Sequence, residues 1–140
     1  MKNARPVEMN LDNLRLVSDC LKDIPHFIFF GTLLGYVREG SIIKGDDDID
    51  IYVDRKMRKA INELLAGSEM KIRRRKEKFK TEFFAQGVRS FGEVQTFADV
   101  YCYEDNPECD YVVDNWNFHG KFKNPETAMH VPRSLLFPLQ

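Results

Sequence analysis

The chain has 140 residues, of which 43% are hydrophobic and 31% are charged, with a formal net charge of −1. These values are typical of one globular domain with a buried core, and the small net charge does not favour nucleic acid or an anionic membrane as a partner. Three cysteines without a CxxC pair and three scattered histidines argue against a disulfide scaffold and against a zinc site. No window has the length and apolarity of a membrane span, and we expect a reducing, cytoplasmic compartment.

The first part of the chain predicts a helix, a strand and a second helix. Apolar residues at helical spacing predict a helix from Val7 to Asp23 that only packs, and Ile24-Pro25 ends it. Phe27–Phe30 is predicted to be a buried strand. Gly31-Thr32 then begins a short helix that Gly40 ends. The backbone N–H groups of this Gly-Thr corner favour a phosphate, with the alternative that the corner simply turns the chain.

Residues 46–53, DDDIDIYV, predict a strand with acidic residues on one face. Asp48 and Asp50 point to the same face, and Asp46 joins them if the strand begins early enough, while Ile49 and Ile51 point to the other face. Carboxylates about 4 Å apart repel by roughly 1 kcal/mol in water and about 4 kcal/mol in a partly buried site. A divalent cation removes this repulsion, so the pattern favours metal binding over a solvated acidic turn. The EF-hand and P-loop patterns are absent.

The next segment predicts a capped helix followed by a basic run. Asp54 caps a helix over Arg55–Leu65, whose apolar stripe includes Leu64, and Gly67 ends it. The basic residues that follow, Lys71–Lys80, form either an edge that attracts an anionic substrate or a solvated edge strand.

Two strands, Glu82–Arg89 and Thr96–Tyr103, are predicted to pair across a turn that contains Gly92. Asp99 lies in the middle of the second strand, where aspartate is disfavoured, and it suits a metal that Asp48 and Asp50 already hold. Beyond these strands we expect elements in the following order: a loop at Glu104–Asp110, a strand at Tyr111–Trp116, a turn at His119-Gly120 and, from Asn124, a polar tail that ends in VPRSLLFPLQ.

Three motifs resemble the LicD/fukutin-related branch of the nucleotidyltransferase-fold superfamily. They are GTLLGYVREG (residues 31–40), DDDIDIYV (46–53) and FADVYCY (97–103), and VPRSLLFPLQ also looks like a family element. The resemblance spans about Leu11 to Tyr103. It implies one α+β (mixed α/β) domain over residues 1–140, with a nucleotidyltransferase-like mixed β-sheet and helices packed on one side.

The resemblance also implies a reaction. Such proteins use Mg²⁺ or Mn²⁺ to transfer phosphocholine, or another phosphoalcohol such as ribitol phosphate, from a CDP-activated donor to a sugar hydroxyl. By implication Asp48 and Asp50 are metal ligands, and Asp99 is the third ligand or the base that accepts the hydroxyl proton. Gly31 and Thr32 would cradle donor phosphates, with Arg38 as a charged clamp.

The chain departs from the family at two places. Lys44-Gly45 stands where the family usually carries Pro-Trp, which affects donor affinity or identity. Family members commonly continue beyond the FPLQ element, so we expect the acceptor-binding part to be absent, trimmed or supplied by another chain. Three alternatives remain: an NTP-dependent nucleotidyltransferase that releases pyrophosphate, a DxD glycosyltransferase, which a longer chain would suit better, and a catalytically silent domain that binds metal or nucleotide.

Overall fold

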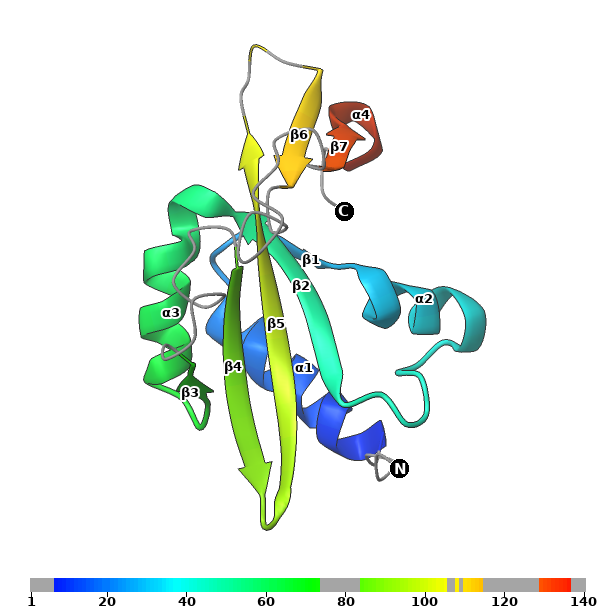
Figure 1. The fold of residues 1–140 in the computed structure, drawn as a ribbon, viewed down its shortest axis with the longest axis vertical. Coiled ribbons are helices and arrows are strands. Elements are labelled where there is room, and N and C mark those ends of the chain that lie inside the picture. The colour runs from blue at the N-terminus through cyan, green and yellow to red at the C-terminus, as the bar shows by residue number, and fades with distance from the viewer. Residues whose placement is uncertain (1–6, 74–83, 106–107, 109, 115–128, 137–140) are drawn as a thin grey trace, which may run out of the picture.

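The computed structural model describes residues 7–73, 84–105, 108, 110–114 and 129–136 (Figure 1). The elements in chain order are α1 (Val7–Cys20), β1 (His26–Ile28), α2 (Phe30–Glu39), β2 (Asp48–Asp54), the 3-10 turn η1 (Arg55–Met57), α3 (Arg58–Ala66), β3 (Lys71–Ile72), β4 (Phe84–Phe91), β5 (Val94–Asp105), β6 (Tyr111–Asp114), β7 (Met129–Pro132) and α4 (Arg133–Leu136).

One mixed sheet organises these elements. Its strand order is β1-β2-β5-β4-β3, and β6 pairs with both β5 and β7. The pair β2–β5 is parallel, while the other pairs are antiparallel. Figure 1 shows α1 crossing behind the central strands, and α3 lies beside it. The predicted α+β class, with a mixed sheet, is therefore confirmed.

The core lies between the sheet and the two helices α1 and α3. Alternate residues of β2 and β5 point into it, and Val17 and Leu21 meet them from the α1 side, with Ile61 and Leu65 from α3. The fully buried apolar residues of the two strands are Ile49, Ile51, Val53, Ala98, Val100 and Cys102. Burying a side chain of valine or isoleucine size contributes about 1.5–3 kcal/mol. This alternation fixes the register of β2 and turns its aspartates to the opposite face.

The junction between β1 and α2 differs from the prediction. The strand ends at Ile28, and Phe30 is already the first residue of α2, with φ of 44°. A phenylalanine in this left-handed region is strained, so the sharp change of direction falls on Phe30 and not on Gly31. The predicted helix end is confirmed, because Gly40 has φ of 69° and its N–H donates to the Tyr36 carbonyl.

The predicted helix after β2 is confirmed, with a different first turn. Asp54 accepts a hydrogen bond from the Lys56 N–H at 2.9 Å, as a cap does, but the turn it caps is the 3-10 turn η1. The α-helix begins at Arg58 and ends at Ala66, before Gly67. Leu64 was expected in the apolar stripe and is 43% exposed, because the stripe that meets the sheet consists of Ile61 and Leu65.

The hairpin β4–β5 is confirmed and is longer than predicted. Phe91 pairs with Val94, so the turn is only Gly92-Glu93, and Gly92 has φ of 64°. The strand β5 runs on to Asp105, which we expected in a loop, because Glu104 and Asp105 pair with β6.

The last described segment is more ordered than the polar tail that was predicted. Met129–Pro132 forms β7 against β6, and α4 follows. Arg133 forms an ion pair with Asp105, and this contact ties α4 to β5. The Arg74–Lys80 part of the basic run, Trp116, the His119-Gly120 turn and the residues from 137 to 140 lie outside the described residues. Within the described helices, none combines the length and apolar composition needed to cross a membrane.

Candidate functional site

Three carboxylates meet on the face of the sheet opposite α1 and α3. Asp48 and Asp50 lie on β2, and Asp99 lies on the neighbouring parallel strand β5, directly opposite Asp50 in register. One carboxylate oxygen from each residue lies within 4.8 Å of the other two. Asp50 and Asp99 are only 5% and 8% exposed. The structure thus brings together the three aspartates that the sequence singled out.

Burial and mutual repulsion raise the pKa of two of these carboxyl groups. Desolvation, followed by the charges of Asp50 and Asp99, raises the pKa of Asp48 to about 8. Desolvation and the charge of Asp99 raise the pKa of Asp50 to about 6, against the opposing effect of hydrogen bonds from Thr32. A cation supplies the positive charge that this cluster needs, and three carboxylate oxygens suit Mg²⁺ or Mn²⁺. The donor set therefore fits the divalent cation that the sequence predicted.

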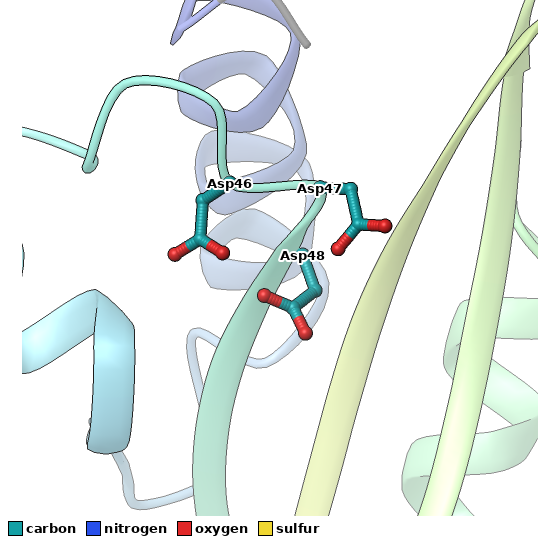
Figure 2. A group of neighbouring side chains, drawn as sticks. All are labelled: Asp46, Asp47 and Asp48. Carbon is teal, nitrogen blue, oxygen red and sulfur yellow. The ribbon is translucent and has the colours of Figure 1, made fainter. Parts of the chain in front are cut away.

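Asp46 lies in the loop before β2, and the strand begins only at Asp48. The expectation that Asp46 extends the strand is therefore wrong, although its side chain stays in the acidic region. Figure 2 shows Asp46 on the α2 side of Asp48 and Asp47 on the β5 side, and one oxygen of each of the three lies within 4.8 Å of the others. The Asp47 carbonyl accepts a hydrogen bond from the Phe97 N–H at 3.0 Å, and this contact holds the loop against β5.

The beginning of α2 faces the acidic cluster at Gly31. A β-carbon at Gly31 would lie 3.2 Å from Asp46 Oδ2 and 3.5 Å from Asp50 Oδ2. Glycine therefore leaves space for two carboxylates, or for a ligand held between them, to approach the backbone.

Thr32 is buried and holds Asp50 in place. Its hydroxyl oxygen accepts a hydrogen bond from the Asp50 backbone N–H at 2.7 Å, and its own backbone N–H donates to Asp50 Oδ2 at 3.4 Å. An anion at the beginning of a helix is favoured by the helix dipole. In this structure the group that takes that place is the Asp50 carboxylate.

Arg38 lies at the other end of α2. It lies seven positions after Gly31 in the helix, which corresponds to about 10 Å along the axis. Its side chain is 59% exposed and forms an ion pair with Glu39 at 3.7 Å. The structure therefore places Arg38 at a distance from the three carboxylates.

Sequence reasoning missed two amides that hold the site. Gln86 on β4 lies opposite Asp99 and donates to Asp99 Oδ1 at 2.7 Å. Asn10 on α1 is fully buried and donates to the Asp46 carbonyl at 2.8 Å, so α1 does more than pack. Assigning the hairpin turn to Gly92-Glu93 would have placed Gln86 beside Asp99, whereas nothing in the sequence pairs Asn10 with Asp46.

A row of aromatic residues borders the carboxylates. Phe27, Tyr52, Tyr101 and Phe84 are direct neighbours across four strands, with successive ring centroids 5.6, 5.5 and 5.2 Å apart. Phe30 continues this surface, with its ring 4.9 Å from that of Tyr101. Tyr52 and Tyr101 follow Asp50 and Asp99 by two residues on β2 and β5, so their rings lie on the same face of the sheet as the carboxylates.

The Lys44-Gly45 departure has a local structural consequence. Gly45 has φ of 90°, a conformation that tryptophan adopts only with strain. The backbone before the acidic loop therefore has a conformation that favours glycine, and Gly45 brings no side chain to the site.

Comparison with known proteins gives a family match over most of the chain. The family model described as LicD/FKTN/FKRP, nucleotidyltransferase domain, matches residues 23–140, a range that contains all three aspartates of the cluster. A search of curated proteins found no match.

Proposed function

The chain belongs to the LicD/FKTN/FKRP nucleotidyltransferase-domain family, a membership that indicates a transferase, and from this premise we propose the reaction that it catalyses. The protein transfers a phosphoalcohol group, phosphocholine-like or ribitol-phosphate-like, from a CDP-activated donor to a hydroxyl of a sugar or glycan. The reaction depends on Mg²⁺ or Mn²⁺.

One observation carries this proposal: the convergence of Asp48, Asp50 and Asp99 within 4.8 Å on a partly dehydrated face. Structural carboxylates that stabilise a fold are usually paired with cations or exposed to water, whereas here burial, together with repulsion from Asp50 and Asp99, raises the pKa of Asp48 to about 8. Perturbed carboxyl groups gathered at one place are characteristic of a functional site.

In the proposed reaction, Asp48 and Asp50 would hold the cation, Asp99 would be either its third ligand or the base, and Asp46 lies close enough to contribute. When bound, the cation neutralises negative charge on the phosphoryl group and on the leaving CMP. The acceptor oxygen forms a bond to the donor phosphorus, and the bond from that phosphorus to the CMP oxygen breaks. Asp99 accepts the proton that the acceptor hydroxyl loses, or acts as the third metal ligand while another group accepts it.

The remaining predicted residues position the donor. Gly31 gives the donor phosphates access to the backbone at the beginning of α2. Thr32 contributes indirectly, because its hydrogen bond holds Asp50 in place. Arg38, on the exposed last turn of α2, clamps the more distant part of the donor. Arg73 belongs to the basic run. Its guanidinium carbon lies 4.9 Å from the centre of the Phe97 ring, on the same face of the sheet as the carboxylates. This placement favours the interpretation of the basic run as an edge that attracts an anionic donor.

A second reaction uses the same carboxylates. An NTP-dependent nucleotidyltransferase also needs a cation held by three acidic residues, and the description of the matching family model as a nucleotidyltransferase domain favours this alternative. The third candidate, a silent binding domain, is favoured by the absence of a ring at Gly45, where the family usually carries tryptophan.

A single assay separates the three candidates. The protein is incubated with Mn²⁺, a panel of CDP-alcohols and NTPs, and sugar acceptors, and the released CMP and pyrophosphate are measured. Release of CMP with acceptor modification supports the proposed function. Pyrophosphate release supports the nucleotidyltransferase, and Mn²⁺ binding without release of either product supports the silent domain.

A further inference from the structure

We propose that Gln86 is a positioning residue, whose amide holds the Asp99 carboxylate in the orientation in which it meets Asp48 and Asp50. The inference rests on the proposed function, because it concerns how the site receives its cation. It assigns a role to a residue of β4, a strand that contributes none of the three carboxylates.

The contact is short, direct and buried. Gln86 and Asp99 are partners across the antiparallel pair β4–β5, and Gln86 Nε2 donates to Asp99 Oδ1 at 2.7 Å. The two residues are 9% and 8% exposed. A buried hydrogen bond between partners on two strands leaves the carboxylate little freedom to rotate.

The other end of the same amide shows that this contact is not explained by stability alone. Gln86 Oε1 is buried and has no hydrogen-bond partner among the residues that the structure describes. An unpartnered buried acceptor costs free energy, and an apolar side chain of similar length would remove that cost. The reversed amide would place Oε1 against the Asp99 carboxylate, so the interaction with Asp99 determines which way the amide points.

An amide also has the right charge for this task. It orients a carboxylate while leaving its negative charge available to a cation. Thr32 does the same for Asp50, because its backbone N–H and its hydroxyl donate to Asp50 Oδ2 at 3.4 and 3.5 Å. By contrast, Asp105 and Asp12, away from the site, are held by the arginines Arg133 and Arg89. Two of the three site carboxylates thus receive hydrogen bonds from uncharged donors, as expected for groups that also bind a metal ion.

The test compares Gln86→Met with Gln95→Met. Methionine matches the length of glutamine but lacks the donor, and Gln95 is an exposed glutamine in the same hairpin. Mn²⁺ affinity is measured by the electron paramagnetic resonance signal of free Mn²⁺, and the melting temperature is measured in EDTA. We expect Gln86→Met to weaken Mn²⁺ binding about 10-fold or more. Its metal-free melting temperature should stay close to that of the wild type, because removal of the unpartnered Oε1 offsets the loss of the hydrogen bond to Asp99, and Gln95→Met should change neither quantity.

Each outcome has a distinct meaning. Wild-type Mn²⁺ affinity in Gln86→Met overturns the inference, even if CMP release upholds the proposed function. Weakened affinity at an unchanged melting temperature supports the inference, even if the wild type transfers nothing. Absence of Mn²⁺ binding by the wild type overturns both. If Gln86→Met does not fold, Gln86→Asn replaces it, because its amide is one methylene too short for the same contact. If neither variant folds, Gln86 is structural and the inference is wrong.

Discussion

The Thr32 hydroxyl accepts a hydrogen bond from the backbone N–H of Asp50, a residue 18 positions further along the chain, at 2.7 Å. This bond joins the beginning of α2 to β2 at the point where β1 ends. A strand N–H that would otherwise lack a partner is satisfied, and the carboxylate of the same residue is held at the centre of the acidic cluster. The Gly-Thr corner and the Asp-x-Asp strand therefore form one unit.

The variant Thr32→Val tests this link. Valine has the shape of threonine but lacks the hydroxyl, so the Asp50 N–H remains buried without an acceptor. We expect the free energy of unfolding to fall by about 1–3 kcal/mol, measured by denaturant titration. Thr32→Ser, which retains the hydroxyl, should recover most of this loss. A fully stable Thr32→Val variant would show that the bond is dispensable.

Gly35 provides a second test, concerning the loop that carries the acidic residues. A β-carbon at Gly35 would lie 2.5 Å from the Ser41 carbonyl oxygen, so alanine forces α2 and the following segment apart. We expect Gly35→Ala to lower the free energy of unfolding by about 1–3 kcal/mol and to weaken Mn²⁺ binding. Gly67→Ala is the matched control, because its β-carbon would make only ordinary contacts at 3.5 Å and beyond. Equal stability of the two variants would contradict the close packing of Gly35 against Ser41.

The raised pKa values predict an inverse dependence of stability on pH. The pKa of Asp48 is about 8 and that of Asp50 about 6 in the folded protein, against an ordinary value of 3.8. Between the ordinary pKa and the raised pKa of each group, the folded state binds a proton that the unfolded state has released. The contribution of these groups to stability therefore falls as pH rises. We expect the melting temperature in EDTA to decrease from pH 5 to pH 8.

The control for this pH dependence is the variant Asp48→Asn, which should lose most of the decrease above pH 6. Saturating Mn²⁺ should also suppress the decrease, because cation binding favours ionised carboxylates. A melting temperature that rises with pH equally in both proteins would show that the cluster does not influence stability.

Removing the metal ion should destabilise the wild type but not the variant Asp48→Asn. A ligand at 100 times its dissociation constant adds about 2.7 kcal/mol of stability. For a chain of this size that corresponds to a rise in melting temperature on the order of 5–10 °C. We expect EDTA to abolish this rise in the wild type. Asp48→Asn should melt higher than the wild type without metal, because one repelling charge is gone, and should respond little to Mn²⁺.

Local patterns predicted the parts of the fold that depend on neighbouring residues. The alternation of Ile49 and Ile51 with aspartates fixed the face of β2, and the positive φ of Gly40 ended α2 where expected. The strain at Phe30 could not be foreseen from the sequence. Phenylalanine favours an extended strand, and the positive φ arises from the change of direction between β1 and α2.

The sequence predicted the carboxylates of the site but not the amides that hold them. An aspartate in the middle of a strand is unusual enough to attract attention, whereas a glutamine such as Gln86 or an asparagine such as Asn10 is not. Both act through contacts set by tertiary structure, 13 and 36 residues away in the chain. The parallel pairing of β2 with β5, which places Asp50 beside Asp99, is likewise a long-range feature that local periodicity does not contain.

The most direct test of the central claim is the rate of CMP release by Asp99→Asn, with Mn²⁺, the preferred CDP-alcohol and its acceptor. Asparagine preserves the size of the side chain but removes the negative charge that accepts a proton or binds the cation. We predict that turnover falls by about 10²–10⁴-fold while the far-ultraviolet circular dichroism spectrum stays that of the wild type. Full activity in a folded Asp99→Asn protein would contradict the assignment of this cluster as the site of transfer.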